Sequence, residues 1–385
     1  RPSTLNIAIL AAGVGKRMRS GMPKVLHPLA GRPLLAHVLD TARKLAADRI
    51  CVVYGHGGEA VRKRFPDADL AWALQDPPLG TGHALAQALP QLAADGVTLV
   101  LFGADPLARV ATLEAVVRNA RQGALSLLTV ELPDPSGYGR IVRRPDGEVE
   151  AIVEHKDATP EQRAIREINS GVMAAPTECF ARWLQAIDNR NTSGEYYLTD
   201  VIALAVKEGV PVRTTNAASV IETLGVNTMR ELALLERLYQ RAQADALLDA
   251  GVTLADPDRI DIRGTLECGA DVAIDAGCVF EGAVRLADDV AIGSCCVLKN
   301  VTVGPGAQIL PFSHLEGATV GANCRVGPYA RLRPGAVLAA GAHVGNFVEV
   351  KASSIGRGSK ANHLAYIGDT TIGANVNFGA GSITA

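Results

Sequence analysis

A glycine-rich segment near the N-terminus combines the residue types that bind phosphate groups. It reads LAAGVGKRM over residues 10–18, directly after an apolar run, and Lys24 follows behind a proline. Small residues let the backbone approach a ligand closely, and successive N–H groups can surround phosphate oxygens. An ordinary strand-to-helix turn also contains glycines, but the added charges of Arg17 and Lys24 favour a phosphate site.

Polar side chains in the C-terminal third form a second group that could carry chemistry. They occur in the stretches Arg331–Pro334, Asn346–Lys351 and Asn362–Tyr366. Cationic and hydroxyl side chains there can bind a phosphate, and a histidine near neutral pH can take a proton from an amine that attacks a thioester. A solvated polar edge would contain the same residue types, so these residues alone leave both interpretations open.

The first group must be positioned by elements that alternate between two patterns up to about residue 225. We expect buried strands over Asn6–Ala11, Ile50–Tyr54, Val97–Phe102 and Leu125–Val130, with helices over Leu34–Leu45, Gly82–Leu92 and Ala111–Ala120. This alternation predicts an α/β fold with a mostly parallel sheet and helices on both faces. Ligands of such sheets bind at the carboxyl ends of the strands.

The second group lies in a segment with a six-residue period. A long amphipathic helix over Met229–Ala250 precedes it, and Gly251 ends that helix. From about residue 252, aliphatic side chains recur at steps of six, with occasional steps of five, as at Ile274, Phe280 and Leu286. This period predicts a parallel β-helix of hexapeptide repeats, whose open faces favour a symmetric oligomer. We expect a loop to leave the coil at the irregular stretch 360–366.

Composition excludes several classes of function. Lys and Arg total 38, Asp and Glu total 40, and the net charge is −2 among 385 residues. This balance gives no general electrostatic reason to bind nucleic acid or a membrane, and 4% aromatic residues argue against a base-stacking surface. The seven cysteines have no C-x-x-C spacing, which favours reduced thiols. We therefore expect a cytoplasmic protein without a nucleic-acid or membrane partner.

Several motifs resemble one enzyme family closely. The segment at 10–18, with the later Pro-Lys pair, is similar to the signature of sugar-1-phosphate nucleotidyltransferases. Further motifs resemble the bacterial family of bifunctional N-acetylglucosamine-1-phosphate uridylyltransferases/glucosamine-1-phosphate acetyltransferases: Tyr54–Gly58, Leu79–Ala84, Gly137–Arg140, Ile152–Ala158, Glu167–Gly171, Gly194–Asp200 and Gly225–Asn227. The resemblance runs from about Leu5 to the last residue. It implies a Rossmann-like nucleotidyltransferase domain at 5–228, a linker helix at 229–251 and a left-handed β-helix acetyltransferase domain at 252–385.

The resemblance implies uridylyl transfer from UTP to N-acetylglucosamine 1-phosphate in the first half, with release of pyrophosphate. The sugar phosphate attacks the α-phosphorus in line, and the protein positions the reactants and offsets charge. By resemblance, the nucleotide is held by Leu10, Ala12 and Gly13, and its uracil by Gln75, Gly80 and Thr81. Arg17 and Lys24 would neutralise the triphosphate. The residues implied to bind the sugar phosphate are Gly139, Glu154, Asn169, Tyr197, Thr199 and Asn227.

The resemblance also implies acetyl transfer from acetyl-CoA to glucosamine 1-phosphate in the second half, and a homotrimer. By resemblance, His363 is the general base, and the sugar phosphate is bound by Arg333, Lys351, Tyr366 and Asn377. Glu349 also matches a residue of the family, and Ala380 would contact acetyl-CoA. Chains of the family continue beyond the position matched by Ala385, and we interpret this sequence as truncated at its C-terminus. We therefore expect acetyl transfer to be absent or very weak.

One motif departs from the family pattern. The family holds Mg²⁺ with a residue that matches Asn227 and with the aspartate of a G-D-x-P-L motif, whereas this chain has Ala104 in that place and Asp105 one position later. In an extended segment this shift would turn the carboxylate to the opposite face, and uridylyl transfer would be weakened because Mg²⁺ requires near-octahedral oxygen geometry. Alternatively, a bend at Gly103 and Pro106 brings Asp105 round to the metal. Both hypotheses stay open at this point.

Two other functions fit parts of the sequence. A different sugar-nucleotide pyrophosphorylase, making ADP- or GDP-sugars, could also carry a β-helix tail. The E-H-K-D motif at 154–157 and the cluster around His363 argue against it. A non-catalytic protein that retains nucleotide affinity would be consistent with Ala104 and the missing C-terminus.

Overall fold

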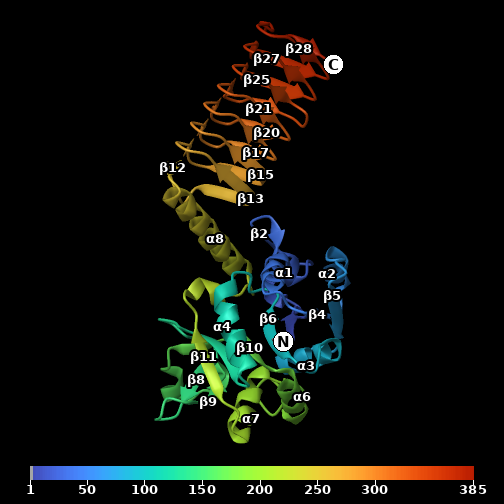
Figure 1. The fold of residues 1–385 in the computed structure, drawn as a ribbon, viewed down its shortest axis with the longest axis vertical. Coiled ribbons are helices and arrows are strands. Elements are labelled where there is room, and N and C mark those ends of the chain that lie inside the picture. Colours follow the sequence, from blue (N-terminus) through green and yellow to red (C-terminus); the bar gives the residue numbers. More distant parts are fainter. Residues whose placement is uncertain (1–2) are drawn as a thin grey trace. The chain divides into compact units, whose positions relative to one another are not determined.

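The computed structural model describes residues 3–385, which divide into two compact units (Figure 1). The first unit extends through Ala233 and the second from Leu234 to Ala385. Helix α8 (Met229–Asp249) therefore lies mainly in the second unit. Among residues 3–385, no helix is both long and apolar enough to cross a membrane.

The first unit is built on a mostly parallel sheet, as the alternating pattern predicts. The order of its main strands is β11-β7-β10-β6-β1-β4-β5. They are β1 (Leu5–Leu10), β4 (Arg49–Gly55), β5 (Leu70–Gln75), β6 (Val97–Phe102), β7 (Leu125–Glu131), β10 (Glu167–Pro176) and β11 (Val212–Asn216). Among these seven strands, only β10 runs antiparallel to its neighbours, β6 and β7. The predicted fold class is confirmed.

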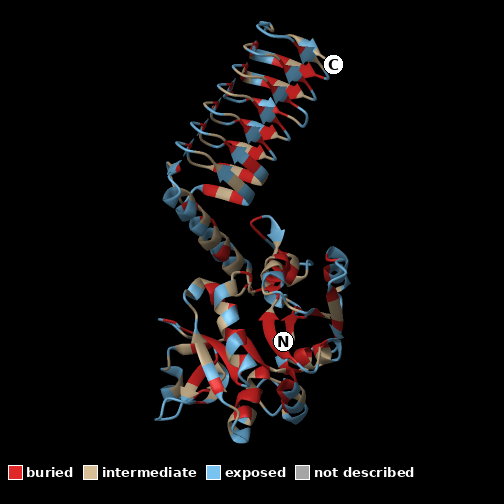
Figure 2. Ribbon diagram, in the orientation of Figure 1, coloured by how far each residue is buried: buried red, intermediate tan, exposed pale blue. Residues whose placement is uncertain are grey.

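Helices cover both faces of this sheet. They are α1 (Leu34–Lys44), α2 (Glu59–Arg64), α3 (Thr81–Ala88), α4 (Val110–Arg121), α5 (Pro160–Arg163), α6 (Thr177–Ala186) and α7 (Val201–Glu208). Strand β1 is buried along its whole length (Figure 2), as expected for a strand covered on both sides. Its residues Ala8 and Leu10 belong to a core with Leu85 of α3, Phe180 of α6 and Ile202 of α7. The carboxyl edge of the sheet stays available for a ligand.

A hairpin extends the sheet beside β10. It consists of β8 (Arg140–Arg143) and β9 (Val149–Val153), and β8 pairs with β10 at Arg140 and Ile168. Two short strands, β2 (Pro28–Leu29) and β3 (Arg32–Pro33), pair separately, ahead of α1. The hairpin brings Gly139 and Glu154, which flank it in sequence, next to β10.

The second unit is a solenoid of short parallel strands stacked coil on coil. Each strand pairs with the strand one coil further along, as Ile274 of β14 does with Ile292 of β16. The strands are β12 (Thr253–Leu254), β13 (Ile260–Cys268), β14 (Ala273–Ile274), β15 (Cys278–Leu286), β16 (Ala291–Ile292), β17 (Val297–Lys299), β18 (Thr302–Val303), β19 (Gln308–Ile309), β20 (His314–Glu316), β21 (Thr319–Val320), β22 (Arg325–Val326), β23 (Arg331–Leu332), β24 (Val337–Leu338), β25 (His343–Lys351), β26 (Ser354–Ile355), β27 (Lys360–Gly368), β28 (Thr371–Ile372) and β29 (Ile383–Thr384).

The predicted repeat of inward-facing aliphatic residues is confirmed, but one expectation is wrong. Residues such as Phe280, Leu298 and Leu332 are fully buried in a single core that follows the axis of the solenoid. The stretch 360–366 does not leave the coil; it belongs to β27, which pairs with β25 from Lys360 to Gly368. Leu364 within it has φ of 46°, but the segment keeps its pairing with the preceding coil, so its polar residues break the apolar pattern without forming a loop.

Helix α8 covers the first coil of the solenoid through the amide of Gln240. The side chain is 1% exposed. Its Oε1 accepts a hydrogen bond from the Ile262 N–H at 2.8 Å, and its Nε2 donates to the Ile262 carbonyl at 2.8 Å. The amide therefore pairs with β13 as a neighbouring strand would. Because an unpaired strand edge is costly when buried, this contact allows the helix to cover the open end of the coil.

Replacing Gln240 with leucine should loosen the first coil. Hydrogen exchange of the Ile262 amide should accelerate roughly tenfold or more, because a buried N–H without an acceptor costs about 1–3 kcal/mol. Gln243→Leu is the matched control, since Gln243 donates to the same carbonyl at 3.3 Å but accepts nothing from the Ile262 N–H. Equal acceleration in the two variants would contradict a specific role for Gln240.

Candidate active sites

A cavity of about 500 Å³ opens at the carboxyl ends of β1, β5 and β6. The glycine-rich segment forms one side, and the turns that follow β5 and β6 form others. Nine residues expected at the uridylyltransferase site contribute to its lining: Leu10, Ala12, Gly13, Lys24, Gln75, Gly80, Thr81, Asp105 and Asn227. Arg17 lies outside this lining and is exposed to solvent.

Lys24 is placed by close packing against the glycine-rich segment. Gly15 has φ of 64°, and a Cβ there would lie 2.9 Å from the Cβ of Lys24. The ammonium donates a hydrogen bond to the Asn227 Oδ1 at 3.1 Å. Burial lowers the pKa of Lys24; the negative charges of Asp105 and Glu231 oppose this shift and the positive charge of Arg17 reinforces it. The site therefore holds a partly desolvated cation within reach of a bound anion.

The opposite end of the cavity is a rigid arrangement of backbone and amide groups. Gln75, which is buried, donates from Nε2 to the Gly80 carbonyl at 3.0 Å and lies 3.0 Å from the His83 Nδ1. A Cβ on Gly80 would lie 2.6 Å from the Tyr196 carbonyl, so only glycine fits there. The Thr81 Oγ1 accepts a hydrogen bond from the Leu198 N–H at 2.9 Å. This end can therefore present fixed polar groups to a planar ring.

Four of the six residues expected to bind the sugar phosphate form a connected group, whereas Asn227 lies in the cavity beside Lys24. The Gly139 carbonyl accepts a hydrogen bond from the Asn169 N–H at 2.8 Å. A Cβ on Gly139 would lie 3.3 Å from the Glu154 Oε1, which itself accepts a hydrogen bond from the Thr199 Oγ1 at 3.3 Å. Burial raises the pKa of Glu154, and the hydrogen bond from Thr199 opposes the rise. Tyr197 is half-buried, two residues before Thr199.

One segment joins these two groups. Gly82 donates to the Tyr196 carbonyl and Tyr196 to the Leu79 carbonyl, both at 2.8 Å. Together with the bond between Leu198 and Thr81, these contacts fix the start of α3 against the chain that leads to Thr199. A ligand bound at Gly80 and Thr81 would therefore lie near the segment that carries Tyr197 and Thr199.

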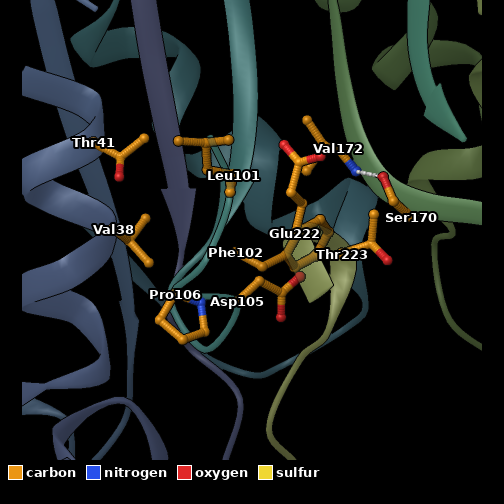
Figure 3. A pocket seen from close by; sticks show the side chains of 11 residues that line it. Val38, Thr41, Leu101, Phe102, Asp105, Pro106, Ser170, Val172, Glu222 and Thr223 are labelled. Atoms are coloured by element: carbon orange, nitrogen blue, oxygen red, sulfur yellow. Dashed lines mark hydrogen bonds between the residues drawn. The ribbon is translucent and has the colours of Figure 1, made fainter. Parts of the chain in front are cut away.

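The shifted aspartate lies in a turn and not in an extended segment. Strand β6 ends at Phe102, and the Asp105 N–H donates to the Phe102 carbonyl at 3.2 Å. The premise of an extended segment is therefore wrong, and Ala104 and Asp105 both line the cavity that Lys24 and Asn227 line. Asp105 packs closely on Gly225: a Cβ added to Gly225 would lie 2.4 Å from the Asp105 Oδ1. It also lines a smaller pocket with Phe102 and Glu222 (Figure 3).

The donor set in this cavity fits a hard divalent cation. Among the described residues, the Asp105 oxygens accept no hydrogen bond, and the Asn227 Oδ1 is engaged by Lys24 alone. Burial raises the pKa of Asp105 to about 7, and the positive charge of Lys24 opposes the rise. Mg²⁺ is commonly bound by one or two protein oxygens, with waters and substrate phosphates completing its shell. Within residues 3–385, no three His, Cys, Asp or Glu side chains cluster as a dedicated metal site.

Sequence analysis missed the buried carboxylate of Glu222. It is 2% exposed and accepts hydrogen bonds from the Thr112 Oγ1 at 2.6 Å and the Ser219 N–H at 3.1 Å. These bonds tie α4 to the segment that leads to Gly225 and Asn227. Ser219 and Glu222 form a capping box, a pattern that the S-x-x-E spacing could have indicated.

The polar residues of the second unit lie at matching positions of successive coils. Arg331 pairs in register with Glu349, and Glu349 with Tyr366. Arg333 donates to the Glu349 carboxylate at 3.2 Å, and the Lys351 Nζ lies 3.5 Å from the Asp369 carboxylate. Arg333, directly after β23, and Lys351, at the end of β25, are thus both turned outward on neighbouring coils.

His363 lies on the same strand as Tyr366. Its Nδ1 is 3.0 Å from the Asn346 Oδ1, one coil earlier. If Nδ1 carries the proton of that hydrogen bond, Nε2 is the nitrogen that can accept one from a substrate. The pairings Lys360–Asn377 and Tyr366–Ile383 both place Ala380 opposite His363 on the following coil. Asn377 is exposed beside Lys360.

Comparisons with known proteins decide the family. Residues 7–187 match the MobA-like NTP transferase domain, and residues 262–355 match the GMPPB C-terminal domain. The chain is 61% identical to the bifunctional protein GlmU of Chromobacterium violaceum over 381 residues, which are 99% of this chain and 84% of that protein. The chain belongs to the GlmU family. Similar proteins of the same name occur in Paraburkholderia phytofirmans (60% identity; 99% and 84% coverage) and Nitrosospira multiformis (58%; 99% and 83%). Membership of the GlmU family confirms the predicted class of bifunctional transferase and disfavours a non-catalytic scaffold.

Asp105→Asn should change thermal stability in a pH-dependent way in the metal-free protein. The folded state holds the Asp105 proton up to about pH 7, whereas the unfolded chain releases it near 3.8, so wild-type stability falls as pH rises between these values. An uncharged asparagine removes this loss. The melting temperature of the variant should exceed that of wild type by a few degrees at pH 8, and the difference should shrink at pH 5.

The control for this prediction is Asp95→Asn, because Asp95 is exposed on the same unit. Differential scanning calorimetry with a chelator present measures both variants. A difference between Asp105→Asn and wild type that is the same at both pH values would show that Asp105 is not desolvated as described.

Proposed function

We propose that this chain makes UDP-N-acetylglucosamine, with uridylyl transfer in the 5–228 domain. The observation that supports this most directly is the single cavity into which the glycine-rich segment, Lys24, the Gln75–Gly80 end and Asp105 all project. A nucleoside triphosphate has the complementary parts: a planar base for the amide end and phosphates for the cationic end. The group around Gly139 and Glu154 then receives N-acetylglucosamine 1-phosphate.

The reaction needs positioning and charge compensation more than acid–base chemistry. The attacking phosphate of the sugar is already an anion, so no residue has to remove a proton from it. The backbone of Leu10, Ala12 and Gly13 holds the nucleotide, while Gln75, Gly80 and Thr81 select uracil. Lys24, with Arg17 approaching from the surface, offsets charge on the triphosphate. Pyrophosphate leaves as the new bond to the α-phosphorus forms.

A divalent cation, Mg²⁺ in our proposal, would be held by Asp105 and Asn227. When bound it would neutralise phosphate charge and orient the triphosphate. The turn after β6 supports this assignment, because it directs Asp105 to the cavity although Ala104 occupies the usual position of the carboxylate. Of the two hypotheses from the sequence, we therefore favour the bend.

Pyrophosphate release from UTP and N-acetylglucosamine 1-phosphate tests this proposal. Wild type should show robust release that depends on Mg²⁺, and Asp105→Asn should reduce it by at least roughly tenfold at fixed Mg²⁺. Even the loss of an outer-shell partner of a metal ligand typically lowers metal affinity or activity by about 10–100-fold. Asp95→Asn should behave as wild type. Release unaffected by Asp105→Asn would exclude this carboxylate, and wild-type release from GTP or ATP instead of UTP would favour another sugar-nucleotide pyrophosphorylase.

For the β-helix domain at 252–385, we propose acetyl transfer from acetyl-CoA to glucosamine 1-phosphate. Arg333 and Lys351 would bind the phosphate, with Tyr366 and Asn377 on the sugar. His363 would accept a proton from the amine as the amine attacks the thioester carbonyl. When the C–S bond breaks, that proton would pass to the CoA sulfur, and CoA would leave as a thiol. Glu349 already orients Arg333, and Ala380, opposite His363, would contact acetyl-CoA.

Lys351→Met should weaken binding of glucosamine 1-phosphate by roughly tenfold, because a hydrogen bond to a charged group contributes about 1.5–3 kcal/mol. Lys299→Met is the control. Lys299 occupies the same coil position three coils earlier, in register with Glu316, and its ion pair with Glu316 is 3.9 Å long. Isothermal titration calorimetry of the full chain measures both variants. Equal losses in the two variants, or no binding by wild type, would contradict the proposed phosphate site.

We also propose that the chain forms a homotrimer. Phe312, Tyr329, Phe347 and Leu364 form an exposed apolar row at one corner of the solenoid, with ring centroids 5.1 and 5.7 Å apart along the stack. A neighbouring copy would cover such a row, because exposed contiguous apolar surface favours association. Sedimentation equilibrium of the full chain measures the mass directly.

A further inference from the structure

A buried arginine lies behind the sugar-phosphate group and bonds to backbone carbonyls rather than to an acid. Arg140, at the start of β8, is 1% exposed. Its guanidinium donates to three backbone carbonyls: Nε to Ile165 at 3.1 Å, Nη2 to Arg163 at 3.3 Å, and Nη1 to Tyr138. Among the described residues it forms no ion pair; the nearby Asp134 is exposed and bonded to Ser136. Burying a guanidinium without a paired anion costs folding free energy, so the arrangement that Arg140 holds in place needs a physical explanation.

The three carbonyls belong to two segments that the guanidinium ties together. Tyr138 is in the turn before β8, whereas Arg163 ends α5 and Ile165 lies between α5 and β10. A guanidinium can do this because it is planar and presents five donors in a rigid fork. An ammonium in the same place could not satisfy three carbonyls in these directions.

Each of these segments leads directly to a residue of the proposed sugar-phosphate site. Gly139 follows Tyr138, and Asn169 lies on β10, four residues after Ile165. The Asn169 N–H bonds to the Gly139 carbonyl at 2.8 Å, and Gly139 packs against Glu154. Arg140 itself is absent from the lining of the nucleotide cavity. The contacts of Arg140 therefore lie on the side of the proposed sugar-phosphate residues.

We propose that Arg140 is a positioning residue for the sugar phosphate: it sets the spacing between Gly139, Glu154 and Asn169 and so determines affinity for the N-acetylamino sugar phosphate without touching it. This inference rests on the proposed function. It predicts a separation of effects between the two substrates that a general loss of stability would not produce.

The test compares Arg140→Met and Arg140→Lys with the control Arg143→Met. Arg143 is on the same strand but pairs at the surface with Glu167 at 2.7 Å. In the pyrophosphate-release assay, the KM for N-acetylglucosamine 1-phosphate should rise about tenfold or more in Arg140→Met, because small misplacements of a binding group are costly. The KM for UTP should change less than twofold. Arg140→Lys should also raise the first KM, and Arg143→Met should leave both unchanged.

A second measurement does not require turnover. Hydrogen exchange of the Asn169 amide should accelerate in both Arg140 variants, at temperatures well below unfolding, and should stay unchanged in Arg143→Met. If Arg140→Met does not fold, Arg140→Lys carries the test. Equal rises in both KM values, or an unchanged Asn169 amide, would overturn the inference. If wild type turns over no sugar phosphate, the proposed function fails, and the Asn169 exchange alone decides whether Arg140 fixes this group.

Discussion

The first unit depends on a conflict between burial and charge at Lys24 and Asp105. Burial disfavours the charged form of each, and the attraction between them offsets only part of that cost. Neither group forms a salt bridge with the other; Lys24 instead donates to Asn227, and Asp105 packs on Gly225. A triphosphate with a divalent cation would supply the missing counter-charges to both. The burial that disfavours the charged forms of Lys24 and Asp105 would also strengthen their electrostatic interactions with that ligand.

The remaining contacts around the cavity fix backbone against backbone. The hydrogen bonds among Leu79, Tyr196 and Gly82 hold the base end. Glu222 holds the segment that leads to Asn227, and Arg140 holds the sugar side. The first contacts join backbone to backbone, and the other two use a buried polar side chain, which is how a site built largely on loops keeps a defined geometry.

The second unit reaches a defined geometry by a different route. Stacked coils bring residues about seventeen positions apart into register, so His363 meets Asn346, and Arg333 meets Glu349. An aliphatic core along the axis keeps that register, and Gln240 of α8 completes the first coil as a substitute strand. The side chains of this core, which stabilise the solenoid, thus point inward, and the polar side chains of the proposed acetyl-transfer site point outward.

The sequence by itself determined the α/β class, the six-residue repeat, the long helix and the glycine-rich phosphate segment, because these follow from local periodicity and short motifs. It also determined the candidate residues, through motifs that resemble one family. Only the tertiary structure decided that Asp105 turns into the cavity, since a hydrogen bond to Phe102 makes a turn where an extended segment was one alternative. Only the structure placed 360–366 within strand β27, because outward polar residues interrupt the periodic signal. Only the structure placed Arg140 behind the sugar group, because two of the carbonyls that it binds are distant from it in sequence.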